Sequence, residues 1–209
     1  MRKALCRYWW IPCIILLIVA SALLSHNESF NIEVRHVYVK DPLSQGVYRG
    51  VTIAQISDLH IRQDDKHVLQ ILEILQDLKV DAIVLTGDYV EWNGDYEVAL
   101  NVIAQFKGDS SVYAVMGDYD YSNSRKSCLF CHEQGTGRPT KRHSVKFLRN
   151  SCDEVAIGND TMMICGVDGR QANEPVSPEV VRHLQNTTEG KAVIVLSHSP
   201  LVFDLIESD

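Results

Sequence analysis

Apolar residues between positions 51 and 209 follow two different periods in turn. Short apolar runs rich in β-branched residues, typical of buried strands, occur at 51–57, 82–86, 112–116, 154–157, 161–167 and 192–197. Between the first two runs, apolar residues recur at helical spacing: Val68, Ile71, Leu72, Leu75 and Leu78. Two more segments, 96–106 and 177–186, are also predicted to be helical. Alternating strands and helices predict an α/β fold built on parallel strands.

The segment before this alternation has a different pattern. Residues 33–40 alternate polar with apolar and predict an edge strand. They belong to a juxtamembrane linker that we place at 29–50, between an N-terminal segment at 1–28 and a domain at 51–209.

The N-terminal segment is basic at its start and then apolar. Arg2, Lys3 and Arg7 precede an uncharged stretch from Tyr8 to Leu24. Basic residues before such a stretch favour a cytoplasmic N-terminus. We therefore expect a single-pass transmembrane helix that anchors an extracytoplasmic domain in the membrane. Ala20-Ser21-Ala22 leaves open the alternative of a cleaved signal peptide and a secreted protein.

Residues that can bind metal follow three of the predicted strands. Asp58 and His60 follow the first, Asp88 the second, and His198 the last. Because the carboxyl ends of parallel strands meet at one edge of a sheet, these side chains are expected to lie together. The pattern predicts a metal-dependent hydrolase, or a protein derived from one.

Four motifs in order strengthen that interpretation: Ser-Asp-Leu-His at 57–60, Thr-Gly-Asp at 86–88, Gly-Asp-Tyr-Asp at 117–120 and Ser-His-Ser-Pro at 197–200. From about Val51 to its C-terminus the chain resembles the calcineurin-like metallophosphoesterase superfamily. The resemblance implies a four-layer α/β/β/α sandwich. It also implies hydrolysis of a phosphomonoester or phosphodiester at two divalent metal ions. Two cations about 3.5 to 4 Å apart can hold the oxygens of a phosphate ester and activate water.

Roles for individual residues also come from the resemblance. Asp58 and His60 would bind the first metal ion, Asp88 would bridge both, and Asp118 and His198 would bind the second. Carboxylates with imidazoles suit Mn, Fe or Zn. In addition, glycines at positions 87 and 117 are expected to let each strand turn sharply before its ligand.

The chain departs from the family pattern at the third motif, which in the family reads Gly-Asn-His-Asp. Asp118 replaces Asn and adds a negative charge where phosphate must approach. Tyr119 replaces a His that is thought to stabilise or protonate the leaving oxygen, and a phenol is a poor proton donor at neutral pH. Asp120 is expected to orient a neighbouring side chain. Tyr119 and Asp120 are thus the candidate catalytic residues.

A second departure lies after His198, because no histidine follows it and the family's Gly-His-Thr-His motif is missing. We therefore expect an incomplete second sheet and weak turnover by the 209 residues. A non-catalytic metal-binding or c-type haem-bearing module on the same scaffold is the alternative function.

Cys128, Cys131 and His132 match the Cys-x-x-Cys-His pattern of c-type haem attachment. Three alternatives remain open: a disulfide between these cysteines or from one of them to Cys152, a structural zinc held by Cys128, Cys131 and His132 or His143, and free thiols. Cys165 lies in an apolar strand, which predicts a small core residue.

The formal net charge of −7 argues against nucleic acid as a partner, since nucleic acid requires a basic face. The resemblance implies instead a phosphate-ester substrate, lipid-linked or from the cell envelope, and the N-terminal helix is expected to bind the membrane.

Overall fold

The structure is a computed structural model. It describes residues 10–28, 32–39, 50–62, 66–91, 95–106, 111–121, 130–131, 138–157, 160–168, 178–188 and 192–206. The chain divides into two compact units, Met1–Tyr38 and Val39–Asp209.

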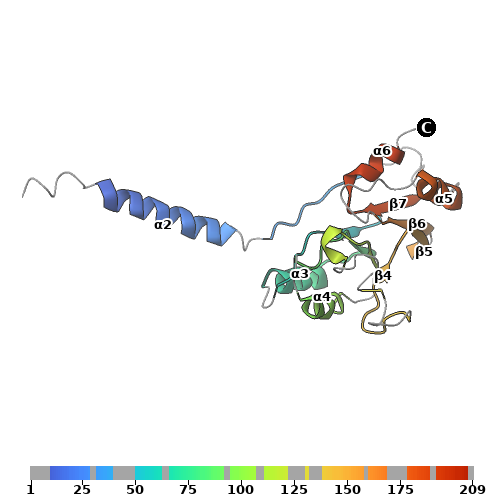
Figure 1. The fold of residues 1–209 in the computed structure, drawn as a ribbon, viewed down its shortest axis with the longest axis horizontal. Coiled ribbons are helices and arrows are strands. Elements are labelled where there is room, and N and C mark those ends of the chain that lie inside the picture. Colours follow the sequence, from blue (N-terminus) through green and yellow to red (C-terminus); the bar gives the residue numbers. More distant parts are fainter. Residues whose placement is uncertain are drawn as a thin grey trace, which may run out of the picture. The chain divides into compact units, whose positions relative to one another are not determined.

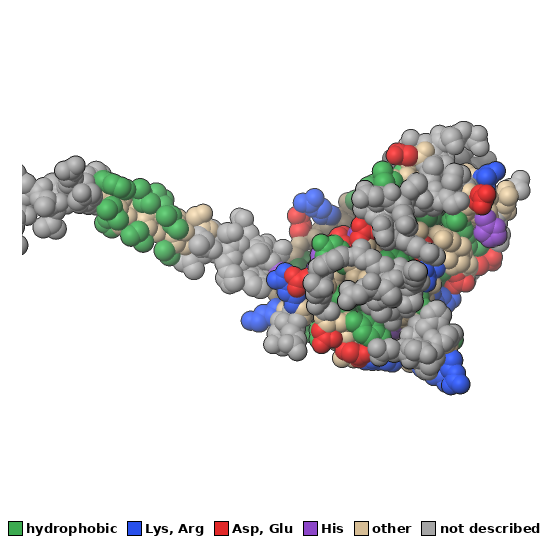
Figure 2. Space-filling view, in the orientation of Figure 1, with side chains coloured by type: hydrophobic (Ala, Val, Ile, Leu, Met, Phe, Trp, Pro, Cys, Tyr) green, Lys and Arg blue, Asp and Glu red, His purple; other side chains and the backbone are tan. Residues whose placement is uncertain are grey.

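The first unit contains helix α2 (Trp10–Glu28). Apolar side chains between Trp10 and Val19 are exposed along this helix. Figure 2 shows hydrophobic side chains of the helix in green. None of the helices in the described ranges combines the length and apolarity that crossing a membrane requires. The edge strand predicted over residues 33–40 is wrong for its described part, because 32–39 form no regular structure. Alternation alone does not make a strand when no neighbouring strand supplies the hydrogen bonds.

The second unit begins with a parallel sheet in the order β1-β2-β3-β4. Its strands are β1 (Ile53–Ile56), β2 (Ala82–Leu85), β3 (Ser111–Ala114) and the two-residue β4 (Lys146–Phe147). Every residue of β2 is buried, as expected for a central strand covered on both faces. The prediction of an α/β fold with parallel strands is therefore confirmed.

Two helices cover one face of this sheet (Figure 1): α3 (Lys66–Asp77) and α4 (Tyr96–Ile103). Ile83 and Leu85 of β2 pack with Val68 of α3 and Leu100 of α4 in one apolar cluster. Helix α4 begins where the Asp95 side chain accepts a hydrogen bond from the backbone N–H of Glu97, which satisfies a donor at the helix start.

A three-stranded second sheet, in the order β5-β6-β7, faces the first one. Its strands are β5 (Ser151–Ile157), β6 (Asp160–Val167) and β7 (Val193–Ser197). Strands β5 and β6 are antiparallel, whereas β6 and β7 are parallel. Apolar residues from both sheets pack together between them: Val84, Tyr113 and Val115 pack with Val155, Met162, Ile164 and Leu196.

The outer face of the second sheet is covered by C-terminal elements: α5 (Pro178–Thr188), the 3-10 turn η2 (Pro200–Val202) and α6 (Phe203–Ile206). Met163 and Val167 of β6 pack there with Leu184 of α5 and Val202 of η2. The layers are therefore helices, first sheet, second sheet and helices, and one apolar cluster lies between each layer and the next.

A disulfide bond joins Cys152 of β5 to Cys165 of β6, with an S–S distance of 2.04 Å. These residues are direct partners in the antiparallel register. The prediction that Cys165 is a small core residue is confirmed, because Cys165 is fully buried, although its disulfide was not foreseen. The alternative that pairs Cys152 with Cys128 or Cys131 is wrong, because Cys152 is bonded to Cys165.

Candidate metal centre

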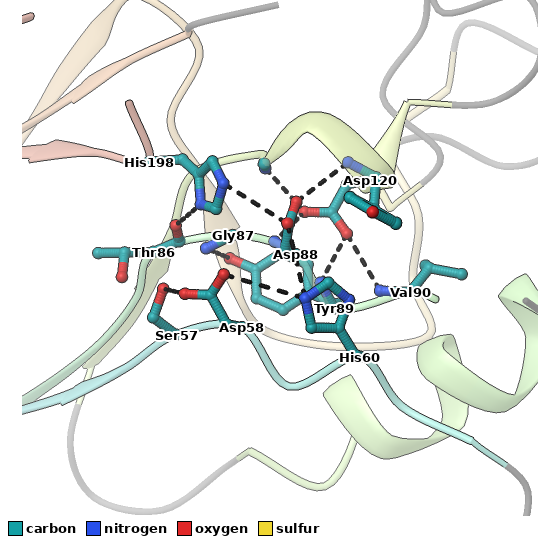
Figure 3. Close-up of polar contacts among 12 residues, drawn as sticks. Ser57, Asp58, His60, Thr86, Gly87, Asp88, Tyr89, Val90, Asp120 and His198 are labelled. Carbon is teal, nitrogen blue, oxygen red and sulfur yellow. Dashed lines mark hydrogen bonds and ion pairs between the residues drawn. The ribbon is translucent and has the colours of Figure 1, made fainter. Parts of the chain in front are cut away.

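The predicted ligands follow strands that end at the same edge of the two sheets (Figure 3). Asp58 and His60 lie just after β1, and Asp88 lies just after β2. Backbone hydrogen bonds continue beyond these strands, since Asp58 N–H donates to the Gly87 carbonyl and His60 N–H donates to the Asp88 carbonyl. The two loops therefore extend the parallel ladder and place the three side chains side by side.

Asp88 lies at the middle of the cluster. Its Oδ2 atom is 3.8 Å from Nε2 of His60 and 3.5 Å from Nε2 of His198. His60 Nε2 is in turn 4.0 Å from Oδ1 of Asp58. Asp58, Asp88 and His198 each offer a ligand atom, and these atoms lie within 4.8 Å of one another. One carboxylate oxygen thus faces a histidine from each of the two sheets.

The ring of His198 is oriented by the first sheet. Its Nδ1 atom is 2.9 Å from the carbonyl oxygen of Thr86, and a carbonyl can only accept. Nδ1 therefore carries the proton, and Nε2, which faces Asp88, keeps its lone pair for a metal ion. A backbone carbonyl that fixes the tautomer of a ligating histidine is a common feature of metal sites.

The carboxylate of Asp58 is oriented by its neighbour. Ser57 Oγ donates a 2.5 Å hydrogen bond to Asp58 Oδ2. The other oxygen, Oδ1, is the one that faces His60. The side chain of Asp58 is 55% exposed, so this edge of the cluster is open to solvent.

Three of the five predicted ligands have a left-handed backbone. Asp58, His60 and Asp88 have φ values of 55°, 41° and 57°. Such values are uncommon outside glycine, and they gather where function requires a strained conformation. The strain turns each side chain out of the strand direction and toward the common centre.

Two glycines allow the loops to approach closely. A Cβ on Gly87, whose φ is 102°, would lie 2.6 Å from the Gly117 nitrogen and 2.9 Å from His198 Nδ1. A Cβ on Gly117 would lie 2.1 Å from Asp88 Oδ1. The predicted sharp turn is found at Gly87 only. Gly117 is extended, with φ −94° and ψ −178°, and a side chain is excluded there by the nearby Asp88.

Asp120 holds the backbone of the loop that carries Asp88. Its carboxylate is fully buried and accepts hydrogen bonds from four backbone N–H groups, those of Asp88, Tyr89, Val90 and Gly117. Burial raises the pKa of Asp120 to about 7, although the N–H groups favour the charged form. The orienting role expected for Asp120 thus acts on the backbone that carries Asp88 rather than on a neighbouring side chain.

The other two residues of the third motif lie in the 3-10 turn η1 (Asp118–Asp120). Tyr119 donates its backbone N–H to Oδ1 of Asp88 at 3.0 Å, and its ring meets that of His60 edge to face at 5.0 Å. Tyr119 is 39% exposed, so its ring borders the opening of the cluster. Asp118 is half-buried in the same turn and is not one of the three residues whose ligand atoms lie within 4.8 Å.

Burial raises the pKa of Asp88, whereas the Tyr119 N–H and the two histidines act in the opposite direction. A carboxylate that is costly to bury as an anion is stabilised by a nearby cation. The donor set of carboxylate oxygens and imidazole nitrogens therefore fits divalent Mn, Fe or Zn.

Of the predicted haem motif, the structure describes Cys131 alone, and Cys128 and His132 lie outside the described residues. Cys131 is disulfide-bonded. Its sulfur is therefore not available for a thioether to haem or as a thiolate ligand of zinc, so the structure favours the disulfide alternative.

Sequence reasoning missed the groups that orient the ligands. Ser57 and Thr86 lie inside the ligand motifs. The sequence does not show, however, that the Ser57 hydroxyl binds Asp58 or that the Thr86 carbonyl oxygen binds the ring of His198. The four N–H donors to Asp120 belong to two loops that meet only in the folded chain.

Comparisons with known proteins agree with this geometry. The family model for the calcineurin-like phosphoesterase matches residues 51–207. The chain is 25% identical over 187 residues to an uncharacterized metallophosphoesterase of Aquifex aeolicus (strain VF5), which covers 85% of this chain and 66% of that protein. It is 21% identical over 195 residues to the uncharacterized metallophosphoesterase YkoQ of Bacillus subtilis (strain 168). That match covers 91% of this chain and 69% of YkoQ. The chain thus spans about two thirds of the length of these relatives.

Proposed function

Since this chain belongs to the calcineurin-like phosphoesterase family, we propose that it hydrolyses a phosphomonoester or phosphodiester at a centre of two divalent metal ions. The observation that carries this proposal is the position of Asp88. Its Oδ2 atom faces His60 on one side and His198 on the other, at 3.8 and 3.5 Å. A carboxylate between two imidazoles from different sheets suits a ligand shared by two ions.

The division of ligands follows from the same distances. Asp58 and His60 would hold one ion together with Asp88, because their facing atoms lie 4.0 Å apart. His198 would hold the other ion, with Asp118 from the adjoining turn η1. When bound, two divalent cations supply positive charge for the phosphate oxygens and lower the pKa of water.

Tyr119 has the position that suits contact with the leaving group. Its ring is packed against His60, it is partly exposed, and its backbone is tied to Asp88. We propose that the phenol donates a hydrogen bond to the leaving oxygen. At neutral pH a phenol transfers a proton less readily than an imidazole does.

The identity of the substrate stays a prediction, as do the membrane anchor at residues 1–28 and an extracytoplasmic location. The Cys152–Cys165 disulfide supports the location, because disulfides persist in oxidising compartments. A lipid-linked substrate would be consistent with such a location.

The test uses the full chain, expressed with export so that its disulfides form. Hydrolysis of p-nitrophenyl phosphate and bis-p-nitrophenyl phosphate is measured with Mn, Fe or Zn, and bound metal is measured after dialysis. We expect metal-dependent turnover, even if weak, and retention of two ions per chain. Asp88→Ala should remove both the turnover and the bound metal.

The matched control is Asp77→Ala, which removes an exposed carboxylate at the end of α3. This variant should keep wild-type turnover and metal content. Retention of two ions without turnover on either ester would favour the non-catalytic metal-binding alternative. Failure of the wild type to retain any ion would contradict both.

A further inference from the structure

The proposed ligands belong to two different sheets. Asp58, His60 and Asp88 follow strands of the first sheet, whereas His198 follows β7 of the second. A centre that uses both sets requires the two sheets to be held in fixed positions at this edge. An ion pair between Arg149 and Asp168 lies where the sheets meet.

The strand registers place both partners of this ion pair at the carboxyl edge. Val167 of β6 pairs with Ser197 of β7, so the next residues, Asp168 and His198, are neighbours on adjacent parallel strands. Phe147 of β4 pairs with Ala114 of β3, and Arg149 lies two residues beyond it. Arg149 is therefore beside the segment of the first sheet that leads to the third motif.

The contacts of Asp168 join the two sheets directly. Its Oδ2 atom accepts a 2.9 Å hydrogen bond from Arg149 Nε, and its side chain is 2% exposed. Its backbone N–H donates to Asn150 Oδ1 at 2.9 Å. Asn150 has a left-handed backbone, with φ 52°, which turns the chain from β4 into β5. Asp168 is thus attached to two successive residues of that turn.

Two further contacts tighten the same junction. A Cβ on Gly166 would lie 2.3 Å from Leu148 Cβ and 2.8 Å from Val115 Cγ1, so β6 packs directly on the ends of β3 and β4. The guanidinium of Arg149 lies over the ring of Tyr121, with Cζ 5.9 Å from the ring centroid. Tyr121 immediately follows the third motif, so Arg149 contacts both the segment after that motif and Asp168, the neighbour of His198 in the strand register.

We propose that Arg149 and Asp168 are positioning residues that hold the His198 loop of the second sheet at the distance that the second metal ion requires. This inference rests on the proposed binuclear function. It predicts that weakening the pair loosens binding of the ion that uses His198, and leaves binding of the ion held by Asp58 and His60 unchanged.

The chemistry of the pair explains why other residues would not substitute well. Arg149 is 25% exposed and Asp168 is almost fully buried, so solvent screens their attraction only partly. A guanidinium is planar and binds through its Nε at a fixed angle, while it stacks on an aromatic ring. A lysine ammonium at the same position would keep the charge but lose both geometric constraints.

The fold provides a matched control in a second ion pair between the same two sheets. Lys146 of β4 contacts Asp153 of β5, which also accepts a 3.1 Å hydrogen bond from Tyr113. This pair joins the sheets, but it lies at strand positions before the carboxyl edge, since Lys146 pairs with Tyr113. Its loss should affect stability without selecting one metal ion.

The experiment titrates the metal-free full chain with Mn by calorimetry and follows Co binding by visible absorption. The variants are Arg149→Lys and Asp168→Asn, with Lys146→Met as the control. Unfolding by urea is measured for each in the absence of metal. We expect the dissociation constant of one ion to rise about 10- to 100-fold in both test variants, the range typical for loss of a group that orients a ligand. The other ion should bind within about twofold of wild type.

If Arg149→Lys and Asp168→Asn bind each of the two ions with the same affinity as wild type, the inference is overturned and the proposed function stays intact. Equal weakening of both ions in the test variants would also overturn it, because a general structural role would act on the whole site. Binding of fewer than two ions by the wild type would overturn the binuclear proposal itself. Lys146→Met should lower the urea midpoint and retain both ions at wild-type affinity.

Discussion

The Nδ1 atom of His198 donates a 2.9 Å hydrogen bond to the carbonyl oxygen of Thr86, so the last strand end of the second sheet is fixed to a strand end of the first. The bond leaves Nε2 facing Asp88 Oδ2 at 3.5 Å. A single imidazole therefore joins the sheets through one nitrogen and contributes to the metal centre through the other.

Replacement of His198 by alanine should remove one of two bound ions. Loss of the ligand itself should cost more than the roughly 10- to 100-fold in affinity that is typical when only an orienting group is lost. Metal content after dialysis and calorimetric titration with Mn would show the change. His183→Ala, which removes an exposed histidine of α5, should bind metal as the wild type does, and equal binding by both variants would contradict the assignment.

Asp120→Asn should destabilise the metal-free chain. The amide keeps the shape of the carboxylate but turns an NH2 group toward backbone N–H donors of Asp88, Tyr89, Val90 or Gly117. Each buried N–H left without an acceptor costs about 1 to 3 kcal/mol. Urea unfolding measures the loss, with Glu73→Gln on the exposed face of α3 as the control. An unchanged midpoint would show that the four hydrogen bonds do not hold the loop.

Tyr119→His should raise turnover, most clearly on esters with poor leaving groups. An imidazole can donate a proton near neutral pH, and general acid assistance is typically worth about 10²- to 10⁴-fold. Rates on p-nitrophenyl phosphate and on an alkyl phosphate would be compared for wild type, Tyr119→His and Tyr119→Phe. The prediction fails if the histidine variant gains nothing on the alkyl ester or if the phenylalanine variant matches wild type there.

Stability should fall in mild acid because of His143. Burial lowers the pKa of His143 from 6.5, and its Nε2–H donates to the Phe130 carbonyl at 2.8 Å. The unfolded chain therefore takes up a proton below pH 6.5 that the folded chain resists, so this contribution is present above pH 6.5 and is lost as the pH falls. Urea midpoints from pH 5 to 8 (about the range in which histidine titrates) should depend less on pH for His143→Gln. Equal pH dependence in the two proteins would argue against burial of a neutral ring.

Expression with an exporting c-type maturation system should give a colourless protein. Cys131 is disulfide-bonded, so it has no thiol to add to a haem vinyl group. Alkylation in denaturant should leave Cys131 unmodified until a reductant is added. A haem absorption band that persists after denaturation would contradict the disulfide.

The sequence predicted those features that depend on local pattern. Each ligand motif follows an apolar run, so the positions of Asp58, His60, Asp88 and His198 at strand ends follow from period and order. Features that depend on pairing between distant strands were missed or misjudged. Cys165 is a core residue as predicted, but its disulfide was missed because only the register of β5 with β6 brings it opposite Cys152. Arg149 and Asp168 carry no motif, and β4 has two residues, too few to show a period.

The left-handed backbone at Asp58, His60 and Asp88 has an evolutionary consequence. Asparagine, aspartate and histidine adopt this conformation several times more readily than other non-glycine residues, and β-branched residues avoid it. The backbone thus selects the same residue types that a metal ion selects. A descendant that lost its metal would still tend to keep Asp, Asn or His at these positions, simply to preserve the shape of its loops. Within such a lineage, finding Asp, Asn or His at these positions would be evidence for the backbone conformation and would not by itself be evidence for catalysis.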